Sequence, residues 1–341
     1  MSTRVLVTGG AGFIGSHLVK RLVSMGADVY VVDNLWRGSL DNLAGENGEP
    51  VLDLKDKFNR IDLCDRHQCV EHIRNFDMVF HLADIVAGVD YVFSNELMIF
   101  QNNIAINTNT LAACIANKIP KYIYVGTACS YPKHLQMHDS VTTLTEDQTY
   151  PAYPESAYGW SKLMGEYEAE LAMKEKLLEV AMLRFHNVYG PNASYEKKRS
   201  QVIPSLIKKA IDYPSEPFIV YGNGKQYRDF VYVDDVIDAL LLASEKGGNR
   251  GVIQIGSEVP TSIKCLAETV ANISGKNIRI QFDESKPTGD IGRISNCERA
   301  RQILGWQAKT ALEEGVRRTY DWIRTDLARK YGASSQSLPA V

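Results

Sequence analysis

Two segments of the chain carry side chains that together could oxidise and reduce a carbinol carbon. Tyr158 and Lys162 are four residues apart, so a helix would place both side chains on one face. The lysine ammonium, together with the positive charge of a nicotinium ring, would lower the pKa of the phenol from about 10 toward neutrality, which would allow Tyr158 to accept a hydroxyl proton. Thr127 lies at the end of a predicted strand, where its hydroxyl could hold the same oxygen. These residues predict hydride chemistry with a nicotinamide cofactor.

A thiol follows Thr127 by two residues. The ordinary pKa of a cysteine, about 8.5, suits the removal of a proton from a carbon next to a ketone. Cys129 therefore predicts a second reaction, the movement of a proton on carbon. The alternative interpretation is that Cys129 is a small buried apolar residue.

A glycine-rich loop follows the first predicted strand and opens a helix. Gly9 permits a tight turn, Gly12 lets the backbone approach a pyrophosphate, and Gly15 allows the helix to pack close to the strand. The first N–H groups of the helix, at Phe13 and Ile14, can bind the phosphate. The spacing and its context predict a dinucleotide-binding site.

Polar residues at the ends of the next two strands extend this predicted site. Asp33 and Asn34 end the second strand, where a ribose diol would lie. A carboxylate would repel a 2′-phosphate, so Asp33 favours NAD, while the nearby Arg37 leaves NADP open. Asp62 and Leu63 are placed to contact the adenine, although Asp62 could instead cap a helix.

The elements that position these residues alternate between short apolar strands and amphipathic helices. The predicted strands are Arg4–Thr8, Asp28–Asp33, Phe58–Ile61, Phe76–Leu82, Lys121–Val125 and Leu178–Phe185, and helices are predicted at Gly12–Met25 and Met98–Asn117. Continuous apolar strands that alternate with helices are typical of a parallel sheet covered on both faces. The sequence therefore predicts an α/β fold with a Rossmann doubly wound parallel sheet.

The pattern becomes less regular after about residue 191. We predict a cofactor-binding domain over residues 1–190, with a return of the chain to it near 228–256. A smaller α/β lobe for the substrate is predicted over 191–330, with short strands at Phe218–Tyr221 and Val252–Ile255. Residues 333–341 are typical of a disordered tail.

The composition excludes several classes of function. The chain has 341 residues, of which 45% are hydrophobic and 23% charged, and its net charge is −3. A near-neutral balance argues against nucleic acid or a membrane surface as the main partner. No apolar run reaches the roughly 18 residues of a membrane span, and the first strand begins too early for a signal peptide. Six cysteines without C-x-x-C pairs predict a cytosolic protein with reduced thiols and no metal site.

The chain resembles the extended short-chain dehydrogenase/reductase family, the nucleotide-sugar epimerases and dehydratases. The resemblance runs from the Thr8–Gly15 loop through Tyr158 and Lys162 to Leu304–Trp306. It implies a Rossmann domain with NAD, a C-terminal lobe that binds a nucleotide-diphosphate sugar, and a homodimer formed through a helix pair that includes the Tyr158 helix.

The segment His81–Asp84 is similar to a turn that contacts the cofactor in this family. Leu82 and Ala83 are therefore expected at the cofactor, whereas Asp84 stands where the family usually has alanine. The family also implies contacts with the sugar diphosphate for three further residues, Asn187, Arg228 and Arg293. Guanidinium groups suit phosphate, although either arginine could instead form a structural ion pair.

The residues after Thr127 discriminate between branches of the family. Dehydratases have Asp-Glu there and decarboxylases have Glu, so the Ala128–Cys129 pair disfavours both reactions. The segment is similar to the branch that epimerises GDP-mannose at C3 and C5, in which a lysine on the opposite face of the sugar completes the inversion. Here Gln201 stands at that position in the predicted substrate site, and Lys197 or Lys198 is the candidate substitute.

Several outcomes remain open at this point. The chain could invert one centre or two, act as a 4-epimerase or 4-dehydrogenase, or stop at a 4-keto product. An alternative of another class is a non-catalytic NAD-binding scaffold or redox sensor.

Overall fold

The computed structural model describes residues 2–86, 88–136, 141–196, 200–286 and 292–332. Within these ranges the strands of the largest sheet are β1 (Arg4–Thr8), β2 (Asp28–Asp33), β3 (Phe58–Arg60), β4 (Met78–His81), β5 (Lys121–Thr127), β7 (Glu179–Phe185) and β11 (Val252–Ile255). They lie in the order β11-β7-β5-β4-β1-β2-β3, and every neighbouring pair is parallel. The predicted α/β fold with a Rossmann doubly wound sheet is confirmed, and the predicted strand and helix ends differ by one or two residues.

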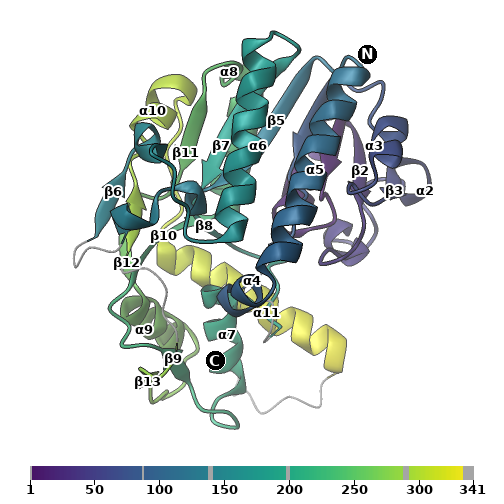
Figure 1. Cartoon of the computed structure of the whole chain (residues 1–341). Coiled ribbons are helices and arrows are strands. Elements are labelled where there is room, and N and C mark those ends of the chain that lie inside the picture. The colour runs from purple at the N-terminus through teal and green to yellow at the C-terminus, as the bar shows by residue number, and fades with distance from the viewer. Residues whose placement is uncertain (1, 87, 137–140, 197–199, 287–291, 333–341) are drawn as a thin grey trace.

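Helices cover both faces of this sheet (Figure 1). The helices of the first half are α1 (Phe13–Ser24), α2 (Leu54–Lys57), α3 (Arg66–His72), α4 (Val89–Ser94), α5 (Glu96–Ala116) and α6 (Ala157–Lys174). Helices α3, α5 and α6 pack beside one another on one face, and α1 packs with α8 (Val233–Lys246) on the other. The tight packing of α5 against α6 fixes the helix that carries Tyr158.

Alternating strand residues supply the two apolar cores. In β1, Val5 and Val7 point into the core beneath α1 and α8, whereas Leu6 points into the core beneath α3 and α5. In β5, Ile123 belongs to the first core and Tyr122 to the second. Successive side chains of a strand point to opposite faces, so a strand buried on both faces needs the continuous apolar runs seen in the sequence.

The second half of the chain contributes to both parts of the molecule. Strand β11 extends the large sheet beside β7, and α10 (Glu298–Leu304) packs on α8. The remaining helices are α7 (Val202–Asp212), α9 (Ile263–Ile273) and α11 (Leu312–Tyr331), which pack on one another beneath the large sheet (Figure 1). The small sheets of the described chain combine β8 (Asn187–Tyr189), β10 (Tyr227–Tyr232) and β12 (Pro260–Ser262); β9 (Ile219–Tyr221) and β13 (Gln281–Asp283); and β6 (Thr142–Leu144) and β14 (Arg293–Ser295).

This arrangement places loops from both halves at the carboxyl ends of the parallel strands. Ligands of doubly wound folds bind at that edge, where the strand order reverses. The predicted tail, residues 333–341, lies outside the described residues. No helix in the described part of the chain is both long and apolar enough to cross a membrane.

Candidate active site

A cavity of about 1200 Å³ lies at the carboxyl ends of the strands. It is lined by every residue that the sequence predicts for the site, namely Gly9, Gly12, Phe13, Ile14, Gly15, Asp33, Asn34, Asp62, Leu63, Leu82, Ala83, Thr127, Cys129, Tyr158, Lys162, Asn187, Gln201, Arg228 and Arg293. The fold therefore brings the predicted cofactor, substrate and catalytic residues to one continuous surface.

The glycine loop has the shape that a dinucleotide requires. Gly9 has φ of +67°, and a Cβ there would lie 2.9 Å from the backbone of Ala83. A Cβ on Gly15 would lie 2.2 Å from the carbonyl oxygen of Gly9, so only glycine lets α1 approach the loop this closely. Within the described chain, no side chain caps α1, whose N-cap is Gly12. The first turn of α1 can therefore offer its N–H groups to a pyrophosphate, and the residues fit NAD.

Asp33 lies at the predicted ribose end of the cavity. Its carboxylate accepts hydrogen bonds from the backbone N–H groups of Ala11, at 3.1 Å, and Leu35, at 2.8 Å. Burial raises the pKa of Asp33, and the two backbone donors partly offset that effect. The carboxylate is thus oriented by the backbone of the loops that surround the cavity.

The predicted adenine end contains Asp62 and Leu63. Asp62 accepts a hydrogen bond from the N–H of Cys64 at 3.0 Å, and α3 is capped by Asp65. The alternative that Asp62 is the helix cap is therefore wrong. Arg37 also lines the cavity, and its guanidinium donates to the carbonyl of Val86.

A buried hydrogen-bond chain joins the glycine loop to the catalytic helix. The Thr8 hydroxyl oxygen accepts from the N–H groups of Leu82 and Ala83, both at 3.2 Å, so its proton is directed to His81 Nδ1, 2.8 Å away. His81 Nε2 then donates to Asn107 Oδ1 at 3.0 Å. This pattern requires a neutral imidazole, and burial, with Lys162 nearby, lowers the pKa of His81 to about 3.

Tyr158 and Lys162 lie on one face of α6, as predicted, and both contact Asp84. The Tyr158 hydroxyl donates to Asp84 Oδ2 at 3.2 Å, and Lys162 Nζ lies 3.1 Å from the same oxygen. The side chain of Lys162 is 2% exposed, and its ammonium lies 5.0 Å from the centre of the Tyr124 ring. Asp84, a residue that the sequence marked only as unusual, is thus part of the catalytic cluster.

In the protein alone, the surroundings of Tyr158 do not favour its ionisation. Burial raises the pKa of Tyr158 well above its usual range, and the Asp84 carboxylate, the Cys129 thiol and the Tyr124 phenol raise it further. The expectation of a lowered pKa combined Lys162 with the nicotinium charge of a bound cofactor, so it stays a prediction for the complex. It did not include Asp84, which pairs with the ammonium and accepts the phenol proton in a hydrogen bond.

Cys129 lies in the single-turn 3-10 helix Ala128–Ser130, directly after β5. Thr127 caps this turn, since its hydroxyl oxygen accepts the Cys129 N–H at 3.3 Å, and the Thr127 O–H is left to donate. Arg293 Nη2 donates to Cys129 Sγ at 3.3 Å, and Nη1 of the same guanidinium donates to Gln136. The alternative that Cys129 is a buried apolar residue is wrong, because its thiol lines the cavity and contacts a cation.

A buried ion pair supports the turn that carries Cys129. Arg184 Nη2 lies 2.5 Å from Glu166 on α6, and both side chains are at most 5% exposed. The Arg184 guanidinium also lies 4.4 Å from the centre of the Tyr131 ring and donates to Thr149 at 2.9 Å. The pair therefore ties β7, α6 and the segment after Cys129 together.

The predicted substrate residues enter the cavity from the second half of the chain. Asn187 donates to the carbonyl of Asp229 at 3.2 Å, and Arg228 donates to the carbonyl of Tyr227 at 2.7 Å. Gln201 is the N-cap residue of α7 and is exposed at the cavity. The candidate lysines at positions 197 and 198 lie outside the described residues.

The structure adds two residues that the sequence did not assign. Asp84 stood out only as a departure from the usual alanine, and its place after a buried strand was the available signal. Gln136 is 1% exposed and holds Arg293 toward Cys129, while its own amide donates to the carbonyl of Tyr131 at 3.0 Å. No local pattern marks Gln136, because its partner Arg293 is 157 residues away.

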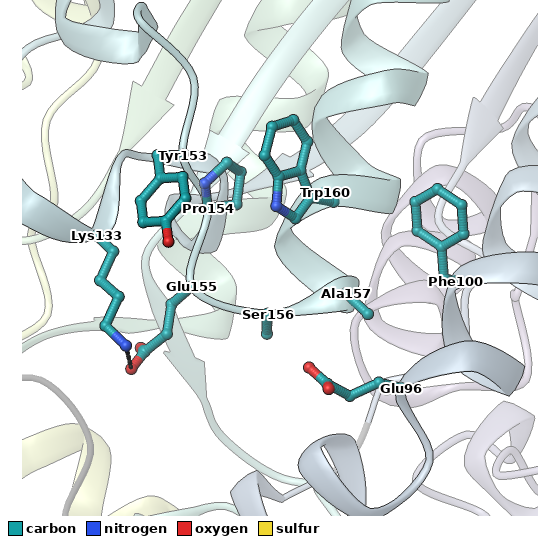
Figure 2. A pocket seen from close by; sticks show the side chains of 9 residues that line it. All are labelled: Glu96, Phe100, Lys133, Tyr153, Pro154, Glu155, Ser156, Ala157 and Trp160. Carbon is teal, nitrogen blue, oxygen red and sulfur yellow. Dashed lines mark ion pairs between the residues drawn. The ribbon is translucent and has the colours of Figure 1, made fainter.

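A second hollow of about 390 Å³ lies beside the main cavity (Figure 2). It is lined by Glu96, Phe100, Lys133, Tyr153, Pro154, Glu155, Ser156, Ala157 and Trp160. Glu155 and Ser156 line both hollows, so the segment before α6 forms the wall between them. An ion pair of 3.7 Å between Lys133 and Glu155 crosses one side of the smaller hollow (Figure 2). None of the predicted catalytic residues lines it, whereas all of them line the larger cavity.

Comparison with known proteins identifies relatives along most of the chain. The sequence profile of the "NAD dependent epimerase/dehydratase family" matches residues 5–256. The chain is 30% identical over 333 residues to GDP-mannose 3,5-epimerase of Arabidopsis thaliana, covering 97% of this chain and 85% of that protein. It is also 30% identical over 335 residues to UDP-N-acetyl-alpha-D-glucosaminuronate decarboxylase of Bacillus cytotoxicus, covering 95% and 98%.

A solved structure adds a third reaction to those of the two relatives. UDP-glucose 4-epimerase of Thermotoga maritima, solved with UDP-glucose, matches with a TM-score of 0.85 and 30% identity, covering 95% of this chain and 100% of that chain. Overall similarity therefore leaves the reaction to be argued from the residues of the cavity.

Proposed function

Because the chain belongs to the NAD dependent epimerase/dehydratase family, we propose that it is a nucleotide-sugar epimerase that oxidises C4 of the sugar and exchanges a proton at C3 or C5. The proposed substrate is a GDP-mannose-like nucleotide-diphosphate sugar. One observation carries the proposal: a thiol with a guanidinium donor, Cys129 with Arg293, lines the same cavity as Tyr158. Bound NAD supplies the chemistry that removes the hydride from C4 and returns it.

The proposed oxidation uses three side chains of this protein. Tyr158 receives the proton of the C4 hydroxyl, because its phenol lines the cavity together with Thr127 at the ends of the strands. Thr127 donates a hydrogen bond to the same sugar oxygen, since its own oxygen is already occupied by the Cys129 N–H. The proposed result is a 4-keto sugar, in which the hydrogens at C3 and C5 are acidic.

Cys129 is the proposed acid/base group for these hydrogens. The thiolate removes a proton from C3 or C5 and returns one from solvent, so no net redox change accompanies the exchange. Arg293 supports this role, because a guanidinium 3.3 Å from the sulfur stabilises negative charge there. The same arginine, with Arg228 and Asn187, is proposed to contact the sugar diphosphate.

Inversion requires a second acid/base group on the opposite face of the sugar. Gln201 cannot serve in this way, since an amide neither gains nor loses a proton near neutral pH. Among the described residues that line the cavity, the lysines are Lys162, which pairs with Asp84, and Lys209, which donates to the carbonyl of Ile219 at 2.6 Å. Lys197 or Lys198 is therefore the proposed second group.

Proton exchange with heavy water tests the proposal directly. The protein is incubated with GDP-mannose in deuterated water, and the sugar is analysed by NMR. We expect deuterium at C3 or C5, and Cys129→Ala should abolish its incorporation while leaving the transient absorbance of reduced cofactor at 340 nm. Cys129→Ser is the matched control for size. Inversion at C4 without deuterium would instead establish a 4-epimerase, for which UDP-glucose is the parallel substrate.

The alternative from another class is a cofactor-binding scaffold or redox sensor. The cluster of Thr127, Tyr158 and Lys162 at one cavity favours an enzyme, since a scaffold has no need for a proton acceptor there. Tyr158→Phe should lower turnover by about 10²-fold or more while NAD binding is retained. Unchanged turnover in this variant would mean that the chemistry lies elsewhere.

We also propose a homodimer in which the α5 and α6 faces of two copies meet. Apolar side chains project from these helices, with Leu97 69% exposed, Tyr167 47% and Leu171 39%. Large exposed apolar side chains on adjacent helices are typical of an interface. Tyr167→Glu should shift the sedimentation coefficient to that of a monomer of 38.1 kDa, whereas Glu175→Gln, beyond the end of α6, should leave it unchanged.

The proposed location is the cytosol. It is supported by the six cysteines, all of which are free thiols. Cys69, Cys114 and Cys297 are buried, and burial raises the pKa of Cys69 and Cys297 to about 12. Cell fractionation with an antibody to the chain tests this location.

A further inference from the structure

Asp84 joins the two functional groups of α6 through a single oxygen. Its Oδ2 accepts the Tyr158 hydroxyl at 3.2 Å and lies 3.1 Å from Lys162 Nζ. Its side chain is only 11% exposed, so water competes little for the carboxylate. A carboxylate in this position can accept a proton from the phenol without any movement of the backbone.

The carboxylate changes how Tyr158 can act as a base. A phenolate would need the positive charge of Lys162, but that charge is neutralised by Asp84. The pKa of Tyr158 is accordingly raised well above its usual range, first by burial and then by Asp84. A free phenolate next to a carboxylate is thus unfavourable, whereas a phenol that passes its proton onward while receiving another stays neutral.

We propose that Asp84 is the proton acceptor behind Tyr158, so that the C4 oxidation runs through a relay instead of a phenolate. The relay rests on the proposed C4 oxidation. The C4 O–H bond breaks as its proton bonds to the Tyr158 oxygen, and the Tyr158 O–H bond breaks as its proton bonds to Asp84 Oδ2. The electron pair of the C4–H bond leaves with the hydride, as in the oxidation already proposed.

The relay suits a reaction that must run backwards in the same site. On reduction of the ketone, Asp84 returns its proton to Tyr158 while Tyr158 protonates the C4 oxygen. The Asp84 side chain is 11% exposed, so the proton exchanges little with solvent between the two half-reactions.

Several titratable and charged groups surround Tyr158 and Asp84. The groups that act on Tyr158 are Asp84, from the loop after β4, Cys129, from the turn after β5, and Tyr124, from β5. Lys162, on the same helix as Tyr158, contacts the same oxygen of Asp84. His81 on β4 also interacts with the charge of Lys162, but burial keeps its imidazole neutral, with a pKa of about 3. Removal of Asp84 therefore leaves Lys162 as the unpaired charge nearest to the phenol.

Tyrosine titration tests the link without substrate. The protein contains 17 tyrosines, so tyrosine labelled with ¹³C at Cζ is followed by NMR from pH 6 to about 10.5, and Tyr158 is assigned from the signal lost in Tyr158→Phe. In the parent protein Tyr158 should remain a phenol throughout. In Asp84→Asn it should ionise within the range, at least about one pH unit lower. Asp56→Asn, which removes an exposed carboxylate, is the charge control and should match the parent.

The pH dependence of the oxidation tests the relay itself. The single-turnover rate at 340 nm should be nearly constant with pH in the parent, while in Asp84→Asn it should rise about tenfold per pH unit, because a phenolate is then required. Asp84→Ala, which installs the residue usual in the family, should behave in the same way if the asparagine variant fails to fold. A rate lowered by one constant factor at every pH, or an unchanged Tyr158 titration, overturns the relay. If the parent oxidises neither GDP-mannose nor UDP-glucose, the proposed function is refuted instead. The tyrosine titration needs no substrate, so it still shows whether Asp84 raises the pKa of Tyr158.

Discussion

Replacement of His81 by glutamine should flatten the pH dependence of stability between pH 7 and pH 5. The neutral imidazole of His81 accepts from Thr8 and donates to Asn107, so a proton added to Nδ1 would break the first bond and place a charge near Lys162. Glutamine retains one acceptor and one donor but does not titrate in this range. The comparison therefore isolates the cost of keeping His81 neutral.

The size of the effect follows from the lowered pKa. The folded protein holds the pKa of His81 at about 3, whereas the unfolded value is 6.5. The contribution of neutral His81 to the unfolding free energy is fully present above pH 6.5 and is lost as the pH falls toward 3. In that range the unfolded chain binds a proton at His81 and the folded protein does not. The parent should lose about 2 kcal/mol of unfolding free energy between pH 7 and pH 5 through His81 alone.

Urea unfolding at pH 7, 6 and 5 measures this loss for both proteins. His17 and His186 also have pKa values lowered by burial, so the parent curve contains their contributions as well. These contributions are common to parent and variant. Any packing defect of the glutamine lowers the stability of the variant by the same amount at every pH. The difference between the two curves should therefore grow by about 2 kcal/mol as the pH falls. Parallel curves would show that His81 titrates normally and that the hydrogen-bond chain is misassigned.

Three further predictions concern the loop, the buried ion pair and the thiol. Gly15→Ala should weaken NAD binding at least tenfold by calorimetry, because its Cβ would lie 2.2 Å from the Gly9 oxygen; unchanged affinity would contradict the close packing of α1. Glu166→Gln should cost about 3–5 kcal/mol in chemical unfolding, since it leaves the Arg184 charge buried without its partner, and a cost below about 1 kcal/mol would refute that role. At saturating sugar, Arg293→Gln should slow deuterium exchange at C3 or C5 about 10²-fold and should lower the rate of C4 oxidation less. Equal losses in the two rates would point to a shared role in substrate binding.

The sequence predicted the fold because its strongest signals are local. A glycine loop between a strand and a helix, and apolar strands that alternate with amphipathic helices, are determined by neighbouring residues. The same locality explains why Tyr158 and Lys162 were correctly placed on one face, since helical spacing alone decides it. Parallel strands then gather their carboxyl ends at one edge, so residues at several strand ends share a cavity without any knowledge of side-chain contacts.

Contacts between distant segments could not be read from the sequence in this way. Asp84 and Tyr158 are 74 residues apart, and Cys129 and Arg293 are 164 apart. Asp84 is the clearest example, because this carboxylate from another element takes the ammonium of Lys162 as its partner. Which charged side chains meet depends on how distant segments pack, whereas the end of a strand depends on the residues of a short segment.

The two charged contacts divide the acid/base work of the cavity. Asp84 places a carboxylate beside Tyr158 and favours the protonated phenol, while Arg293 places a guanidinium beside Cys129 and favours negative charge on the sulfur. In the proposed reaction, the contact with Asp84 serves the oxygen that receives and returns a proton, and the contact with Arg293 serves the sulfur that takes a proton from carbon. A chain with alanine at position 84 would lack the first half of this division, and its tyrosine would depend on Lys162 alone.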